Sequence, residues 1–241
     1  MRNEICITLD VDWAPDFVID YVAKILIRKK IKATWFATHM SKDVLELVKN
    51  PLFEVGLHPN FLSNSTQGTN PEEILENLKS LFPTAKSIRT HSLLQSSSLL
   101  MLFHKFGIEN DVSLLLERTK NIAPHYSPYF HLYRFPFFWE DDVAMSYNNW
   151  EVEQLINIPG MKIFNFHPIH IYLNSKNMEN YNKLKTSFGK DLNFQNLENF
   201  INNERDGAGM FFVSLTNYLV GKKSTTIIDL QREFIELNES N

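Results

Sequence analysis

Short apolar segments alternate with amphipathic ones along the first third of the chain, and this alternation constrains the fold more than any other feature. Strand-like apolar runs cover residues 5–9, 33–38 and 53–57, and residues 16–30 have apolar side chains at helical spacing. Strands that alternate with helices form βαβ units in a parallel sheet. The pattern predicts an α/β protein in which about seven or eight strands form a (β/α) barrel.

The rest of the chain shows the same two periodicities, less regularly. Further helices are expected over residues 44–48, 71–81, 96–106, 197–203 and 226–237, with Ser41 and Asn70 as N-caps. Further strands are expected over residues 87–89, 132–135, 161–166 and 210–215, and weak structure over 172–191. Since no repeat or linker divides the chain, we expect a single catalytic domain over residues 1–241.

Charge and composition exclude several classes of protein. The net charge of −4 and the lack of a basic tract argue against a nucleic-acid partner. Cys6 is the single cysteine, which excludes a disulfide scaffold. No apolar run reaches the roughly 20 residues of a transmembrane helix, and charged residues come too early for a signal peptide. We expect a soluble cytoplasmic protein, and the oligomeric state stays open.

Ionisable and polar residues follow the predicted strands at the point where each strand ends. They are Asp10 and Asp12 after the first strand, His58 and Asn60 after the third, Arg89 and His91 around the fourth, and His167 and His170 after a late one. A parallel barrel brings these ends to one mouth. Carboxylates and imidazoles that converge there are typical of a divalent metal site with an acid/base pair.

Asp10 and Asp12 lie two residues apart, so in an extended strand they share a face. A cation or an arginine relieves their repulsion, so one can bind metal while the other accepts a proton. Arg89 is expected to keep Asp10 ionised, and His58 and His91 are the candidate imidazole ligands. The alternatives are that the acids cap the next helix, that His58 is a core histidine, and that His91 binds substrate.

The late histidines and an acidic segment complete the candidate site. His167 is interpreted as the acid that protonates a leaving group, and His170 as a weaker candidate. Trp139 and Glu140 lie in an aromatic and acidic run, which suggests a wall for a sugar ring with an acid that orients Arg89 or a histidine. A solvated turn is the alternative for that run.

The order of these motifs resembles the polysaccharide deacetylases of carbohydrate esterase family four, which share the chitooligosaccharide deacetylase homology domain. Residues 8–13 read TLDVDW where the family has Thr-Phe-Asp-Asp-Gly. The resemblance implies that Asp10 is the general base and Asp12 a metal ligand. Val11 separates the two acids here, so exchanged roles remain an alternative.

The later motifs extend the resemblance to about His170. The family's second motif is His-Ser/Thr-x-x-His, of which this chain has His58, while Leu62 takes the place of the second histidine. Asn60 or His91 is the candidate replacement. Residues 89–91, Arg-Thr-His, resemble the family's Arg-x-Pro, and the motif ending at His167 resembles Leu-x-His, the site of the general acid.

The resemblance implies a distorted (β/α) barrel and a function. GLHPNF at residues 56–61 and FHPIH at 166–170 resemble an offshoot encoded among bacterial surface-polysaccharide genes. We therefore expect a metal-dependent hydrolase, with zinc the favoured cation, that removes N-acetyl or similar acyl groups from a sugar. The alternatives are another metal-dependent amidohydrolase acting on a small amide, and a non-catalytic carbohydrate-binding member of the fold. A nicotinamide enzyme is excluded because no glycine-rich turn follows the first strand.

Overall fold

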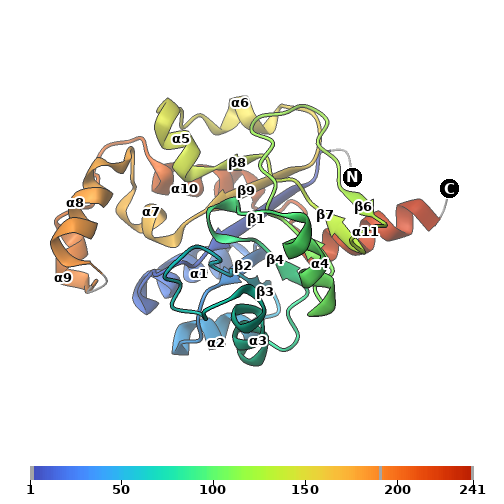
Figure 1. The fold of residues 1–241 in the computed structure, drawn as a ribbon. Coiled ribbons are helices and arrows are strands. Elements are labelled where there is room, and N and C mark those ends of the chain that lie inside the picture. Colours follow the sequence, from blue (N-terminus) through green and yellow to red (C-terminus); the bar gives the residue numbers. More distant parts are fainter. Residues whose placement is uncertain (1–2, 190–191, 240–241) are drawn as a thin grey trace.

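The computed structural model describes residues 3–189 and 192–239 and forms one curled, mostly parallel sheet covered by helices (Figure 1). The strand order is β6-β7-β5-β4-β3-β2-β1-β9-β8, and only the pair β6 and β7 is antiparallel. The strands are β1 (Ile5–Asp10), β2 (Ala33–Ala37), β3 (Phe53–Leu57), β4 (Ser87–Ile88), β5 (Asn110–Asp111), β6 (His125–Ser127), β7 (Leu132–Arg134), β8 (Trp139–Glu140) and β9 (Lys162–Phe166).

The α/β fold and the distorted-barrel architecture are confirmed, with one difference in detail. Within the described residues, the outer strands β6 and β8 do not pair with each other, so the sheet is a half-barrel that does not close. The sheet of the described residues has nine strands, more than the seven or eight expected. Strands of only two residues, such as Asn110–Asp111 and Trp139–Glu140, add to the count. Runs of two residues carry too little periodicity for sequence patterns to detect.

The helices pack around this sheet, with α8 and α9 at one end of the molecule and α11 at the other (Figure 1). The α-helices are α1 (Asp16–Lys29), α2 (Lys42–Lys49), α3 (Pro71–Leu81), α4 (Ser97–Lys105), α5 (Asp141–Tyr147), α6 (Val152–Ile156), α7 (Pro168–Leu173), α8 (Met178–Phe188), α9 (Phe194–Glu198), α10 (Ala208–Leu219) and α11 (Ile227–Glu239). The predicted caps are confirmed: Ser41 accepts from Val44 N at 3.2 Å, and Asn70 accepts from Glu73 N at 3.0 Å.

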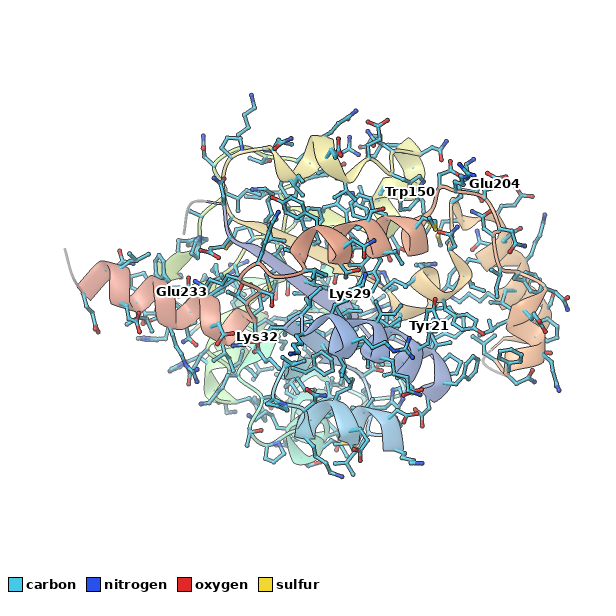
Figure 2. All side chains as sticks on the ribbon, turned by 180° about the vertical axis from the view of Figure 1, so that it is seen from behind. Tyr21, Lys29, Lys32, Trp150, Glu204 and Glu233 are labelled. Carbon is cyan, nitrogen blue, oxygen red and sulfur yellow. The ribbon has the colours of Figure 1, made fainter. Side chains whose placement is uncertain are left out.

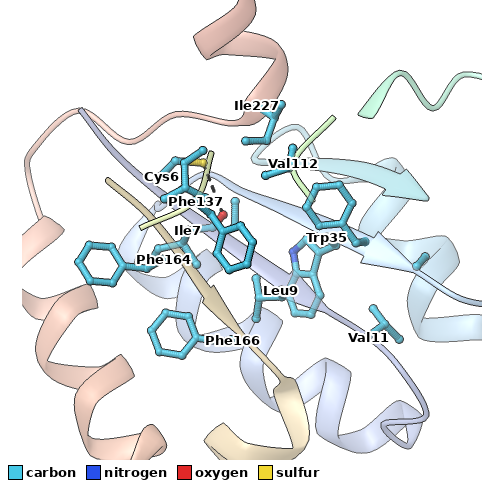
Figure 3. Close-up of a cluster of buried hydrophobic side chains, with 14 of the residues drawn as sticks. Cys6, Ile7, Leu9, Val11, Trp35, Val112, Phe137, Phe164, Phe166 and Ile227 are labelled. Carbon is cyan, nitrogen blue, oxygen red and sulfur yellow. Dashed lines mark hydrogen bonds between the residues drawn. The ribbon is translucent and has the colours of Figure 1, made fainter. Parts of the chain in front are cut away.

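Strand β1 lies at the centre of the core and sets the position of the site. All six of its residues are buried, and it pairs in parallel with β2 on one side and β9 on the other. Figure 3 shows Trp35 and Phe166 beside Leu9 of this strand. Because β1, β3, β4 and β9 are parallel, their carboxyl ends meet at the same edge of the sheet.

The strand predicted over residues 210–215 is wrong, because this segment lies within the 12-residue helix α10. Short apolar runs do not distinguish a strand from a buried helix, and the aromatic composition favoured the strand. Figure 2 shows α10 crossing the back of the molecule beside the labelled Lys29 and Trp150. Lys29 Nζ donates to Thr216 Oγ1 at 2.6 Å, and the helix buries Phe211 and Phe212 against the sheet.

The weak structure predicted over residues 172–191 is also wrong as far as residue 189, since α8 forms there and residues 190–191 lie outside the described part. Helix α8 presents mostly polar side chains to solvent and buries only Tyr181 and Leu184. So narrow an apolar stripe gives a weak helical signal in the sequence. None of the helices in residues 3–189 and 192–239 has the length and apolar character that crossing a bilayer requires.

Candidate active site

A left-handed turn at the end of β1 positions the Asp12 carboxylate. The strand ends at Asp10, Val11 N continues the ladder to Phe36 O at 3.0 Å, and Asp12 then has φ of 46°. Aspartate tolerates this conformation better than most residues. The sequence analysis predicted that Asp10 and Asp12 share one face of an extended strand. This prediction is wrong, because Asp12 lies beyond the end of the strand. The turn, held by a hydrogen bond from Thr38 Oγ1 to the Asp12 carbonyl, directs the carboxylate instead.

The structure brings Asp12, His58 and His91 together from three separate loops. Asp12 Oδ1 lies 3.2 Å from His58 Nε2 and 3.2 Å from His91 Nδ1. One ligand atom from each of the three residues lies within 4.8 Å of the other two. His91 thus joins Asp12 and His58 in this group. These are the three side chains predicted as metal ligands, and their assignment remains a proposal.

The chemistry of this group fits a divalent cation. His58 Nδ1 lies 2.8 Å from the carbonyl oxygen of Arg89, which only accepts, so Nδ1 carries the proton and Nε2 presents a lone pair. His58 Nε2 is buried and makes no hydrogen bond in the structure. Burial favours protonation of Asp12, but the His58 and His91 imidazoles beside the carboxylate outweigh burial and hold the Asp12 pKa well below its usual value. One carboxylate and two imidazoles are suitable zinc ligands.

Arg89 is fully buried and directed at Asp10. Its Nη1 donates to Asp10 Oδ1 at 3.1 Å, and its Nε donates to the Val112 carbonyl at 3.1 Å. The guanidinium lies between the rings of Phe36 and Phe137, 4.7 Å and 4.5 Å from their centres. The two cation–π contacts and these hydrogen bonds hold the arginine in place, so it can orient the Asp10 carboxylate.

Asn165 is a member of this network that the sequence analysis missed. Its Nδ2 donates to Asp10 Oδ2 at 2.8 Å and to Glu140 Oε1 at 2.9 Å, and its Oδ1 accepts from Thr8 Oγ1 at 3.0 Å. Thr8 and Asn165 are directly paired across β1 and β9. The signal was present, because an amide within the apolar run of residues 162–166, two residues before His167, needs buried partners.

His167 lies across the site from Arg89 and is held by Asp141. His167 Nδ1 lies 2.7 Å from Asp141 Oδ1, and His167 Nε2 lies 3.9 Å from Asp12 Oδ2. Burial alone lowers the His167 pKa, but the carboxylates of Asp142 and Asp141 outweigh burial and raise it well above its usual value. This direction favours the protonated imidazole, which is the form that a general acid requires.

Comparison with models of protein families identifies the family of this chain. A family described as WbmS-like polysaccharide deacetylase matches residues 7–185, more than half of the 241 residues. The chain belongs to this family. The matched stretch includes every residue of the Asp12, His58, His91 group and its neighbours Asp10 and His167.

Solved structures agree with this family. WbmS from Bordetella bronchiseptica, described provisionally as a polysaccharide deacetylase involved in O-antigen biosynthesis, is 31% identical over 89% of this chain and 90% of that one, with a TM-score of 0.81. The peptidoglycan deacetylase PdaC of Bacillus subtilis is 13% identical over 98% and 96% of the two chains, with a TM-score of 0.50, which shows the shared fold alone. The comparison with curated proteins finds no match.

Within this deacetylase-family site, the predicted role of Trp139 is wrong. Trp139 is 1% exposed and stacks on Phe211 of α10, with ring centres 4.3 Å apart, so its ring belongs to the core and does not reach a substrate. The following residue, Glu140, alternates to the opposite face of β8 and joins the Asn165 network. Burial raises the pKa of Glu140 to about 7.

The other two predicted substrate-binding residues differ in position. Asn60 lines the cavity described below, where its backbone N donates to Gln67 Oε1 at 2.6 Å. His170 is buried behind Asp142, with Nε2 3.0 Å from Asp142 Oδ1 and Nδ1 3.1 Å from Ser175 Oγ. His170 thus supports Asp142, and direct contact of either residue with substrate stays a prediction.

A cavity of about 770 Å³ opens above the candidate ligands. Its floor includes Asp12 and His91, and its walls include His39, Asn60 and Asp142. Helix α8 supplies a further wall through Met178, Tyr181 and Lys185. This volume suits a ligand of one or a few sugar rings. The contribution of α8 was missed because its sequence gave no clear helical signal.

The Asp141→Asn substitution tests whether the Asp141 carboxylate raises the His167 pKa. Loss of the carboxylate removes one charge and weakens the 2.7 Å hydrogen bond, so the His167 pKa falls. A general acid must be protonated, so the alkaline loss of activity should move to lower pH, and kcat should fall about 10- to 100-fold. The pH–rate profile of hydrolysis measures both changes.

Glu153→Gln is the matched control for this test, because it removes an exposed carboxylate from the neighbouring helix α6. It should leave the profile unchanged. An Asp141→Asn profile that coincides with the parent profile would show that His167 does not act as the acid.

Proposed function

We propose that this member of the WbmS-like family is a metal-dependent deacetylase that removes an N-acetyl group, or a similar acyl group, from a sugar of bacterial surface-polysaccharide metabolism. The observation that carries the proposal is the Asp12, His58, His91 group, flanked by an arginine-held carboxylate and a carboxylate-held imidazole. The proposal extends to zinc as the cation and to the cytoplasm as the location.

Asp12, His58 and His91 would hold the cation. When bound there, a divalent cation supplies Lewis-acid polarisation of the acyl carbonyl and lowers the pKa of a water molecule. Asp10 lies beside this group, with its Oδ1 3.9 Å from His58 Nδ1. The two assignments follow from the contacts: Asp12 touches both imidazoles, while Asp10 touches Arg89 and Asn165.

Asp10 acts as the general base. Both of its oxygens accept hydrogen bonds, Oδ1 from Arg89 and Oδ2 from Asn165, and these bonds orient the carboxylate. In this orientation Asp10 takes a proton from the attacking water. The water oxygen bonds to the carbonyl carbon as this proton leaves. Arg89 and Asn165 are positioning residues, because they act through Asp10.

His167 acts as the general acid. As the bond between the carbonyl carbon and the amide nitrogen breaks, the imidazolium donates its proton to that nitrogen. Asp141 keeps Nδ1 protonated and therefore directs Nε2–H toward the site, where it lies 3.9 Å from Asp12 Oδ2. Water is consumed and the products are acetate and an amino sugar.

Acetate release from a panel of N-acetylated sugars, with and without zinc, tests the proposed function. We expect acetate to form, to disappear after chelation and to return when zinc is added. Ammonia or another acid from small amides, with no acetate from sugars, would favour a different amidohydrolase. Saccharide binding without turnover under every metal tested would favour a non-catalytic binding protein.

A further inference from the structure

Two aromatic rings form one wall of the cavity. Trp13 follows the left-handed turn at Asp12, and Tyr181 comes from α8; their ring centres lie 5.6 Å apart at an interplanar angle of 36°. Both residues line the cavity that contains Asp12 and His91. Tyr181 is buried, while Trp13 is half-buried, so the Trp13 ring is the one that can pack against the apolar face of a sugar ring.

A lysine lies over the same two rings. Lys185 Nζ is 5.4 Å from the centre of the Trp13 ring and 5.5 Å from that of Tyr181. Lys185 follows Tyr181 by four residues in α8, so both side chains lie on the helix face that lines the cavity. The two rings hold the ammonium group at the cavity wall through cation–π contacts.

Lys185 differs from the neighbouring lysines in having no acidic partner among the described residues. Lys183 pairs with Glu179 at 2.6 Å, and Lys176 pairs with Glu204 at 2.7 Å. Three carboxylates among the described residues line the cavity. Asp12 contacts His58 and His91, Asp142 contacts His170, and Asp16 forms no ion pair with Lys185. Among the described residues that line the cavity, Lys185 is the one permanent cation, and it forms no ion pair with the carboxylates there.

We propose, resting on the proposed function, that Lys185 binds an anionic group of the substrate while the sugar ring packs on Trp13. The substrate class is then an anionic N-acetylated sugar. Its negative charge comes either from a ring carboxylate, as in a uronic acid, or from a phosphate linked to the sugar. A neutral acetamido sugar fills the same site without using the ammonium group.

Three probes separate these cases: N-acetylglucosamine, N-acetylglucosaminuronic acid and UDP-N-acetylglucosamine. With the zinc-loaded protein, the anionic probe that matches the site should have a KM about tenfold below that of neutral N-acetylglucosamine. The preference should weaken as salt is raised, because salt screens exposed charges. A uronic-acid preference indicates the carboxylate, and a preference for the nucleotide sugar indicates the phosphate.

Lys185→Gln should raise the KM of the preferred anionic probe about tenfold and leave that of N-acetylglucosamine unchanged, with kcat retained for both. Lys183→Gln is the matched control, since it removes an equal charge from the same helix where Glu179 already pairs with it. This control should leave all three KM values unchanged. Equal KM values for neutral and anionic probes, or no effect of Lys185→Gln, would overturn the inference.

Direct binding keeps this inference separate from the proposed function. Calorimetric titration of the Asp10→Asn variant with the same probes measures affinity without turnover. Tighter binding of an anionic probe that requires Lys185, with no acetate released by the parent protein, would support the inference and overturn the deacetylase proposal. Acetate release without any anionic preference would overturn the inference and leave the deacetylase proposal standing.

Discussion

Asp10→Asn should reduce kcat for acetate release about 10²- to 10⁴-fold while the protein keeps its zinc. The amide is nearly the same size as the carboxylate, so it fits the same space, although its NH2 group cannot accept one of the two hydrogen bonds from Arg89 and Asn165. An amide does not take up a proton at neutral pH, so the attacking water loses its base. Metal content by elemental analysis and initial rates on one preparation measure both quantities.

Asp20→Asn is the matched control, since it makes the same chemical change at an exposed acid that pairs with Lys24 at 2.6 Å in α1. It should have the parent rate and the parent zinc content. If Asp10→Asn retained parent-like turnover, Asp10 would not be the base. If it lost zinc instead, the roles of Asp10 and Asp12 would be exchanged.

Asp12→Asn should weaken zinc binding by about 100-fold and reduce turnover in proportion at limiting zinc. Asparagine tolerates the left-handed backbone at this position, so the turn that carries the side chain is kept. What is lost is the one negative charge that lies 3.2 Å from each of two imidazoles. A competitive titration against a chelator gives the affinity, and circular dichroism confirms the fold.

Asp142→Asn is the control for this second prediction. Asp142, His167 and His170 form another group with ligand spacing and are one of two alternative positions for the cation; Asp10, Glu140 and His167 form the other. Parent-like zinc affinity in Asp142→Asn together with loss in Asp12→Asn assigns the cation to the Asp12 group. The opposite pattern would assign it to the Asp142 group.

The sequence predicted the helices and strands that are long enough to show a hydrophobic periodicity. Alternating periodicities identified β1, β2 and β3, and the polar residues after those strands converge because parallel strands share one carboxyl edge. The same rule brought His91 to Asp12, although no sequence spacing relates them directly. Strand-end position was therefore the most informative property of the candidate site residues.

The remaining features depend on tertiary contacts that no local pattern contains. Helix α10 was predicted as a strand because a buried helix and a buried strand have the same apolar composition. The orientation of Asp12 depends on one left-handed residue, and the burial of Trp139 depends on Phe211 from a distant helix. The aromatic wall of the cavity depends on α8, whose narrow apolar stripe carries little periodic signal.

Anomalous diffraction at the zinc edge from crystals of the zinc-loaded protein tests the central claim most directly. We predict one strong peak about 2.0 to 2.2 Å from the nearest carboxylate oxygen of Asp12, from His58 Nε2 and from a ring nitrogen of His91. No peak among these three atoms, or a peak bound by Asp142 and His170 instead, would contradict the proposed metal centre and the mechanism built on it.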